Sequence, residues 1–299
     1  MNKIEVQAAD QQIFCVRHWP HPAPRARLQI LHGMAEHCER YQPLAEFLHQ
    51  HGVEVIAHNH RGHGERGPAG HFADQDGWNK VLADVSTAQQ VGNPQVPLFL
   101  LGHSMGSFIA RSWAARHGER LQGLLLSGSN QQPPGLFYLG RSVAWLLQRL
   151  QGGQHLSGVM NWLSFAAFNK PFQPARTGFD WLSRDPRAVD QYMGDPQCGH
   201  LCSLQLWQDV FGGLIEISRP ASARQIPATL PLYLFGGDMD PVGRLGQGLP
   251  ALAQLFAHTG HDKVTLRLYP EGRHEMLNEQ NASDVFNDLL QWLNQQLPA

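Results

Sequence analysis

The stretch from Leu98 to Ser107 reads LFLLGHSMGS, and it decides the fold. Its first four residues are apolar and predict a buried strand that ends at Gly102. A glycine lies two residues before Ser104 and another two residues after it, which indicates a sharp turn with close neighbours. This G-x-S-x-G pattern is typical of a turn that lifts a serine hydroxyl clear of a parallel sheet. A plain glycine-rich turn has the same pattern, so the rest of the chain must decide between them.

Further short apolar runs also lead into loops, and amphipathic stretches such as 78–85 and 285–293 alternate with them. These strand-like runs are Arg27–Leu31, Val53–Ala57, Leu124–Leu126, Leu232–Phe235 and Val264–Tyr269, with an N-terminal hairpin at 4–6 and 13–16. This alternation predicts an α/β fold whose mostly parallel central sheet is flanked by helices. Ligands of such sheets bind at the carboxyl ends of the strands, which is where all these loops begin.

The alternation stops between about Ser129 and Thr229, where helix-like runs at 136–150 and 159–168 hold many large apolar residues. We predict that 1–128 and 230–299 form the α/β core and that 129–229 form a helical cap inserted after the sixth strand. An ordinary helical subdomain that only packs on the core is the alternative, and both descriptions can hold together. The large apolar residues expected to line a pocket in this cap are Phe137, Trp145, Leu146, Trp162, Phe165 and Phe168.

The composition is that of a globular chain of 299 residues, with 42% hydrophobic and 16% charged residues. A net charge of −2 gives the whole molecule no attraction to nucleic acid or to an anionic membrane. The N-terminus has no apolar leader, and no apolar run reaches the ~18 residues of a membrane span. The four cysteines lack the spacing of a disulfide scaffold or a zinc site, so we expect reduced thiols, a cytoplasmic protein and no cofactor.

Three of the 17 histidines, His58, His60 and His63, lie close together in the sequence. They could form a three-ligand metal site in a loop, or they could be solvated or hydrogen-bonded loop residues. The second interpretation needs no further ligand, and we expect no metal.

The chain offers the partners that a nucleophilic serine needs. A serine hydroxyl is activated by an imidazole, and a carboxylate fixes the tautomer of that imidazole. The expected chain order is Ser, Asp, His, and here Asp240 and His274 each follow a predicted strand. Asp238 competes with Asp240. Oxyanion donors would be the backbone N–H groups of Met105 and Met34.

The spacing of two charged residues adds a prediction for the loop that holds Met34. Glu36 and Arg40 are four residues apart. Such a pair could brace this loop, or it could be a surface pair of little consequence.

The chain resembles the monoacylglycerol lipase and bacterial lysophospholipase branch of the α/β-hydrolases, also labelled serine aminopeptidase-like. The motifs span nearly the whole chain: His32-Gly-Met-Ala-Glu-His37 with Arg40-Tyr41, Arg61-Gly-His-Gly64, Gly102-His-Ser-Met-Gly106, Asp240-Pro-Val242, Arg273-His-Glu275 with Asn278-Glu279, and in the cap Asn169-Lys-Pro-Phe172 and Arg176–Asp185. The resemblance implies Ser104 as nucleophile, Asp240 rather than Asp238 as the triad acid, His274 as base, and Met34 and Met105 as the oxyanion hole.

The sequence departs from this family at three places. Asn59 stands where relatives often carry Asp, Gly64-Glu-Arg66 stands where many have a serine, and Ser107 follows the elbow where a glycine is frequent. These differences concern the bracing of loops and the shape of the pocket, and none falls on the triad.

The resulting expectation is a serine hydrolase that cleaves carboxylic esters, with a lysophospholipid or a monoacylglycerol as the substrate. The alternatives are a small-ester carboxylesterase, an aminopeptidase-like amide hydrolase that uses a cap carboxylate such as Asp180 or Asp185, and an inactive binding protein. We expect no nucleic-acid partner and at most a transient contact of the cap with a membrane surface, peripheral to the inner membrane. The sequence leaves the oligomeric state open.

Overall fold

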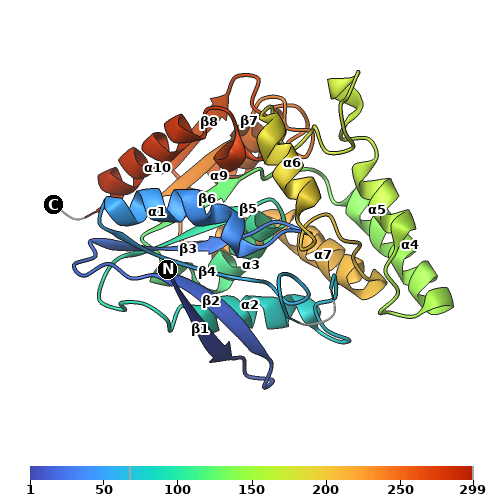
Figure 1. Ribbon diagram of the computed structural model, residues 1–299, viewed down its shortest axis with the longest axis horizontal. Coiled ribbons are helices and arrows are strands. Elements are labelled where there is room, and N and C mark those ends of the chain that lie inside the picture. Colours follow the sequence, from blue (N-terminus) through green and yellow to red (C-terminus); the bar gives the residue numbers. More distant parts are fainter. Residues whose placement is uncertain (67–68, 298–299) are drawn as a thin grey trace.

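The computed structural model describes residues 1–66 and 69–297. In this part of the chain, eight strands form one sheet in the order β1-β2-β4-β3-β5-β6-β7-β8 (Figure 1). The strands are β1 (Asn2–Gln7), β2 (Ile13–Trp19), β3 (Ala26–Leu31), β4 (Val53–His58), β5 (Leu98–His103), β6 (Gly123–Ser127), β7 (Leu232–Gly237) and β8 (Val264–Tyr269). The hairpin β1–β2 pairs antiparallel and β2 joins β4 antiparallel, whereas β3 to β8 pair in parallel.

Helices cover both faces of the sheet (Figure 1). On one face, α1 (Gln42–Gln50) and α10 (Ala282–Gln296) bury apolar side chains against the strands. On the other face lie α2 (Gly77–Ala88), α3 (Met105–His117) and α9 (Gly248–His258). The predicted α/β class with a mostly parallel sheet is confirmed: β3 to β7 are short apolar runs that are buried on both faces, between the two layers of helices.

Five helices lie between β6 and β7, where the strand-and-helix alternation of the sequence stops. They are α4 (Gly135–Gln151), α5 (Gly158–Phe165), α6 (Pro186–Gly194), α7 (Leu204–Ile217) and α8 (Pro220–Gln225). Helix α7 packs on both α3 and α4, while α4 and α5 lie farthest from the sheet (Figure 1). The side chains of Ser157 and Ser203 cap α5 and α7 by accepting from Met160 N and Leu206 N.

The parallel strands bring four loops to one edge of the sheet. The loops after β3, β5, β7 and β8 carry Met34, Ser104, Asp240 and His274, and all four residues border or adjoin one cavity. The α4–α8 segment extends from this same edge (Figure 1). In the described residues, no helix combines the length and the hydropathy that crossing a bilayer requires.

Candidate active site

Ser104 occupies a strained backbone position between β5 and α3. Its φ of 51° and ψ of −121° lie outside the regions that a residue with a side chain normally adopts. A Cβ on Gly102 would collide with the carbonyl of Gly106, and a Cβ on Gly106 would collide with the carbonyl of Leu31. The two glycines are therefore required because strand β5, the start of α3 and the end of β3 pass within contact of one another. The strain exposes the Ser104 hydroxyl to the cavity, and this hydroxyl makes no hydrogen bond with any described residue.

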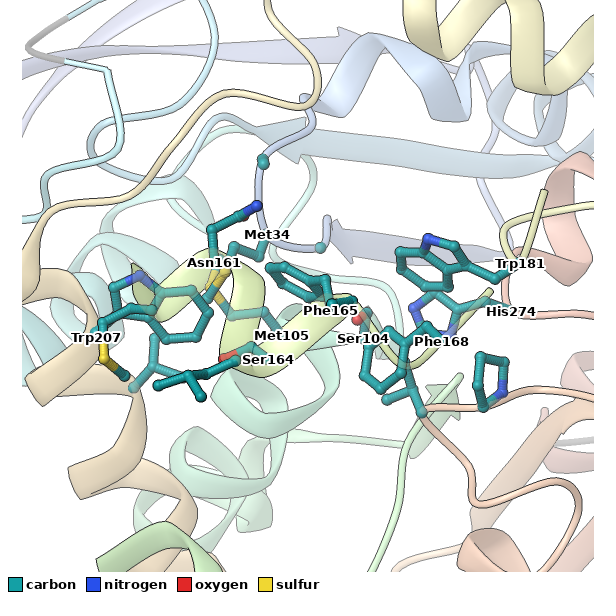
Figure 2. Close-up of a pocket in the computed structure, with 18 of the residues that line it drawn as sticks. Met34, Ser104, Met105, Asn161, Ser164, Phe165, Phe168, Trp181, Trp207 and His274 are labelled. Carbon is teal, nitrogen blue, oxygen red and sulfur yellow. The ribbon is translucent and has the colours of Figure 1, made fainter. Parts of the chain in front are cut away.

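His274 borders the cavity next to this serine (Figure 2), and it is hydrogen-bonded to the buried Asp240. His274 Nδ1–H donates to Asp240 Oδ1 over 3.0 Å, and both residues are 2% exposed. The Val242 amide also donates to Asp240 Oδ1, at 2.8 Å, which holds the carboxylate in place. Asp238 makes no hydrogen bond with His274, and its Oδ1 is buried without a partner. The geometry thus brings together Ser104, Asp240 and His274, and leaves Asp238 outside.

The charge of Asp240 controls the basicity of His274. Burial acts to lower the pKa of His274, but the Asp240 carboxylate outweighs it, so the pKa lies above its ordinary value. An imidazole whose Nδ1–H is held by a carboxylate presents Nε2 as its basic nitrogen. His274 is therefore arranged to accept a proton on the side that faces the cavity.

Two backbone amides near Ser104 can bind an oxyanion. Met105 is the first residue of α3, so its N–H lacks an intrahelical partner. Met34 lies in the loop after β3, and Met34, Ser104 and Met105 all border the same cavity (Figure 2). A Cβ on Gly33 would lie 3.2 Å from Ser104 Cβ, which shows how closely this loop approaches the serine.

A buried ion-pair network ties this loop to the loop of His274. Arg40 Nη1 donates to Glu36 Oε2 over 2.7 Å, and its two terminal nitrogens bind the Glu275 carboxylate at 2.7 and 2.6 Å. Glu36 Oε1 accepts from the Gly33 amide at 2.5 Å and from the Tyr41 hydroxyl at 2.9 Å. Glu36 is 3% exposed, so the interpretation of Glu36–Arg40 as a surface pair is corrected: the pair is a buried brace.

Two of the residues that depart from the family pattern, Asn59 and Ser107, also brace the site. Asn59 Oδ1 accepts from the Cys38 amide at 2.8 Å, just after the Met34 loop. The Ser107 hydroxyl donates to the Ser104 carbonyl over 2.6 Å, so it supports the strained turn from inside α3. The sequence does not predict either interaction. In each of them one partner is a backbone group, and residue spacing does not show which backbone groups lie within hydrogen-bond distance.

The cavity at this edge has a volume of about 710 Å³ and is lined mostly by apolar side chains (Figure 2). Of the six residues expected to line it, Phe137, Trp162, Phe165 and Phe168 do so. Trp145 and Leu146 do not, and this expectation is corrected: they are 51% and 56% exposed on the outside of α4. Successive residues of an α-helix are rotated by about 100° around its axis, so these two fall on the side of α4 that faces away from the cavity.

The cavity also has walls that the sequence did not predict. The Trp181 ring centroid lies 5.2 Å from that of His274, and Trp207 and Met160 complete an apolar wall. Asn161 and Ser164 bring polar groups to the cavity from α5 (Figure 2). Trp181 lies outside any helix or strand, so periodicity could not find it. Its one signal was its place in the cap motif 176–185.

The clustered histidines lie beneath the Met34 loop. His58, His60 and His63 are at most 2% exposed, so the interpretation as solvated residues is wrong, whereas that as hydrogen-bonded residues holds for His60 and His63. His60 Nε2–H donates to the His32 carbonyl, and His63 Nδ1–H donates to the Arg61 carbonyl. Burial lowers the pKa of His58 to about 4 and that of His63 to about 3, so these rings are neutral near pH 7.

Known proteins of similar sequence and structure include lipases and an esterase. The family described as serine aminopeptidase, S33, matches residues 22–281. The monoglyceride lipase of Rattus norvegicus is 31% identical over 299 residues, covering 97% of this chain and 88% of that protein. The monoacylglycerol lipase of Mycolicibacterium smegmatis is 27% identical over 278 residues, covering 92% and 90%. The crystal structure of a thermostable carboxyl esterase from Bacillus coagulans, in complex with glycerol, has a TM-score of 0.92 at 27% identity and 99% coverage of both chains.

Proposed function

The chain belongs to the serine aminopeptidase S33 family, and we propose that it cleaves long-chain monoacylglycerols through Ser104, His274 and Asp240. It is an α/β-hydrolase of the monoacylglycerol lipase-like branch, an enzyme that hydrolyses carboxylic esters. One observation carries the finer proposal: a strained serine and a histidine that is paired with a buried aspartate border the same largely apolar cavity of about 710 Å³.

The proposed reaction begins with attack of Ser104 Oγ on the acyl carbon of the ester. His274 Nε2 takes the serine proton, and Asp240 stabilises the imidazolium that results. The carbonyl oxygen becomes an oxyanion that the Met34 and Met105 amides bind. When this intermediate collapses, His274 returns the proton to the departing alcohol, and the acyl group remains on Ser104.

Water then releases the acid. His274 takes a proton from a water molecule, the hydroxide attacks the acyl carbon, and Ser104 Oγ leaves with the proton from His274. The brace from Glu36 through Arg40 to Glu275 holds the Met34 loop and the His274 loop in fixed relative positions during both steps. We propose that residues 129–229 act as the cap and that 1–128 with 230–299 form the catalytic core.

The lining of the cavity favours an acyl chain with a neutral headgroup. Aromatic and aliphatic side chains from α4, α5 and α7 surround the space next to Ser104. Among the described lining residues, Arg244 is the one Lys or Arg, and it is exposed. The phosphate of a lysophospholipid would need buried cations. The hydroxyls of a glycerol headgroup need neutral hydrogen-bond partners, such as the side chains of Asn161 and Ser164. Monoacylglycerol is therefore preferred over lysophospholipid, which remains the second candidate.

The mouth of the cavity supports transient contact with a membrane. Leu136, Leu139, Trp162 and Leu163 line the cavity and are also 53–67% exposed, so they form an apolar rim. Residues 121–179 contain four Lys or Arg and no Asp or Glu, although the whole chain has a net charge of −2. An apolar rim within a positively charged segment is suited to an anionic lipid surface. We propose that a cytoplasmic, peripheral enzyme takes its substrate from that surface.

The alternative functions have less support. A peptidase needs a free carboxylate for the substrate amine, but Asp180 accepts from Thr177 Oγ1 and Asp185 caps α6. A small-ester esterase needs no cavity of this size, and an inactive binding protein needs no buried Asp–His pair beside a strained serine.

Two measurements test the proposal. A fluorophosphonate should label Ser104 of the wild-type protein and leave Ser104→Ala unlabelled; no labelling would favour the binding protein. Long-chain monoacylglycerol, lysophospholipid and an aminoacyl amide should then be compared by kcat/KM. We expect monoacylglycerol to be cleaved fastest, and faster turnover of the amide would support the peptidase instead.

Sedimentation with anionic vesicles tests the membrane contact. Binding should weaken as salt is added, and Trp162→Ala should weaken it further. Equal binding by the wild type and the variant would exclude the apolar rim as the contact surface.

A further inference from the structure

A second cluster of reactive side chains lies beside the loop of Met34, away from the triad. His37 comes from this loop, and Asp195 and Cys198 come from the segment that follows α6. Each offers one atom, a nitrogen, an oxygen and a sulfur, and these atoms all lie within 4.8 Å of one another. The Cys198 amide donates to the Asp195 carbonyl over 3.0 Å, so a tight turn presents both side chains together. Among the described residues, no other group of three such ligands meets this distance.

The surroundings of His37 are those of a metal-binding imidazole. His37 is 5% exposed, and its Nε2 lies 2.8 Å from Asp195 Oδ2. On its other side, Nδ1 lies 3.3 Å from Glu39 Oε2 but has no aligned hydrogen bond, so a buried nitrogen lacks a partner. A neutral imidazole has one N–H and cannot donate to carboxylates on both sides. A cation bound at Nε2 would let Nδ1–H turn toward Glu39, which is the carboxylate–histidine–metal arrangement.

We propose that His37 Nε2, the Asp195 carboxylate and Cys198 Sγ bind a divalent transition-metal cation, with Zn²⁺ as the best fit. Nitrogen, oxygen and thiolate donors are the set that Zn²⁺ accepts, and three protein ligands leave a fourth position for water. Binding forms the Zn–S bond as the Cys198 thiol loses its proton to solvent. The Asp195 side chain is 29% exposed, so the cation can reach the site from solvent.

The site joins the segment after α6 to the loop that carries the Met34 amide. The Gly199 amide donates to the Ala35 carbonyl over 2.9 Å, and the Tyr192 hydroxyl donates to the same carbonyl at 3.1 Å. A cation held by His37, Asp195 and Cys198 would add a third connection across this junction. Because the cation binds the folded chain and not the unfolded chain, it should raise the melting temperature, and the rise should grow with the logarithm of the Zn²⁺ concentration once the site is saturated.

Calorimetric titration with Zn²⁺ tests the site on the full chain. We expect one equivalent to bind and the melting temperature to rise. Co²⁺ should bind in its place with a thiolate-to-cobalt absorption band. Cys198→Ser should abolish that band, and Glu39→Gln should weaken binding ~10- to 100-fold. The matched control is Cys202→Ser, a buried cysteine four residues away that is outside the cluster and should bind like the wild type.

Three results would overturn the proposal: no binding by the wild type, unchanged binding by Cys198→Ser, or loss of binding by Cys202→Ser. Asp195→Asn keeps the size of the side chain, so weaker binding by a variant that melts like the wild type separates ligand loss from misfolding. Equal Zn²⁺ binding by the wild type and Asp195→Asn is a fourth contradicting result, because it would exclude Asp195 as a ligand.

Discussion

Ser104 combines a strained backbone with a reactive side chain. Its φ of 51° is a conformation that costs about 1–3 kcal/mol for a residue with a Cβ. This conformation is possible because Gly102 and Gly106 have no Cβ, so the neighbouring backbone can pack closely on both sides of the turn. The strain holds the hydroxyl in the cavity where the proposed chemistry takes place.

Ser104→Gly should therefore separate stability from activity. Removing the nucleophile should lower ester turnover by on the order of a million-fold. The relief of backbone strain should exceed the entropic cost of a glycine and raise the free energy of unfolding by about 1 kcal/mol. Ester assays and urea denaturation check both effects. A variant that keeps one tenth of the wild-type turnover would exclude Ser104 as the nucleophile.

The two aspartates near the end of β7 should behave very differently. Asp240→Asn should lower kcat/KM by ~10⁴-fold, whereas Asp238→Asn should have little effect, because only Asp240 contacts His274. Catalysis needs neutral His274, so kcat/KM should rise with pH through the raised pKa of this residue. In Asp240→Asn that rise should move to lower pH. A severe loss in Asp238→Asn would reverse the assignment.

The elements of the core could be predicted because each apolar run is short and ends in a loop. The apolar runs that begin at Leu232 and Val264 correspond to β7 and β8, and both strands end within two residues of the predicted positions. In the α4–α8 segment, the sequence predicted α4 and α5 but not α6 to α8, and it did not predict which side of α4 faces the cavity. Packing against α7 decides that side, so Trp145 faces outward although its sequence neighbourhood is apolar. The brace through Glu275 could not be foreseen, because its partners are 235 residues apart.

The opposite positions of Phe165 and Trp145 give a matched pair of variants. Phe165 borders the cavity and packs against Trp207, whereas Trp145 is outside. Phe165→Ala should lower kcat/KM for long-chain esters about tenfold or more and leave acetate esters nearly unchanged, since each buried methylene contributes about 0.8 kcal/mol. Trp145→Ala should leave both unchanged with dispersed substrates. Equal losses in the two variants would show that Phe165 only stabilises the cap.

On the scale of the whole molecule, buried neutral histidines couple stability to pH. The pKa of His58 is about 4 in the folded chain and near 6.5 in the unfolded chain. Between these values the unfolded chain binds the proton more readily, so stability is full above pH 6.5 and is lost as the pH falls toward 4. The loss from this one residue is roughly 3 kcal/mol.

His58→Leu should remove this contribution. Its melting temperature should fall less between pH 7 and pH 5 than that of the wild type, because Leu cannot bind a proton. The exposed His258 supplies the control, and His258→Gln should follow the wild type. Identical pH dependence in His58→Leu and the wild type would contradict the neutral, buried state of the cluster.

The central claim is that Ser104 acts on esters whose acyl chain fills the cavity between α4, α5 and α7. It is tested most directly by kcat/KM for monoacylglycerols with acyl chains from about two to about sixteen carbons, below the concentration at which they aggregate. Because each buried methylene contributes about 0.8 kcal/mol, kcat/KM should rise several-fold per carbon until the cavity of about 710 Å³ is full and should then level off. A flat profile, or one with its maximum at acetate, would contradict the account and identify a small-ester esterase.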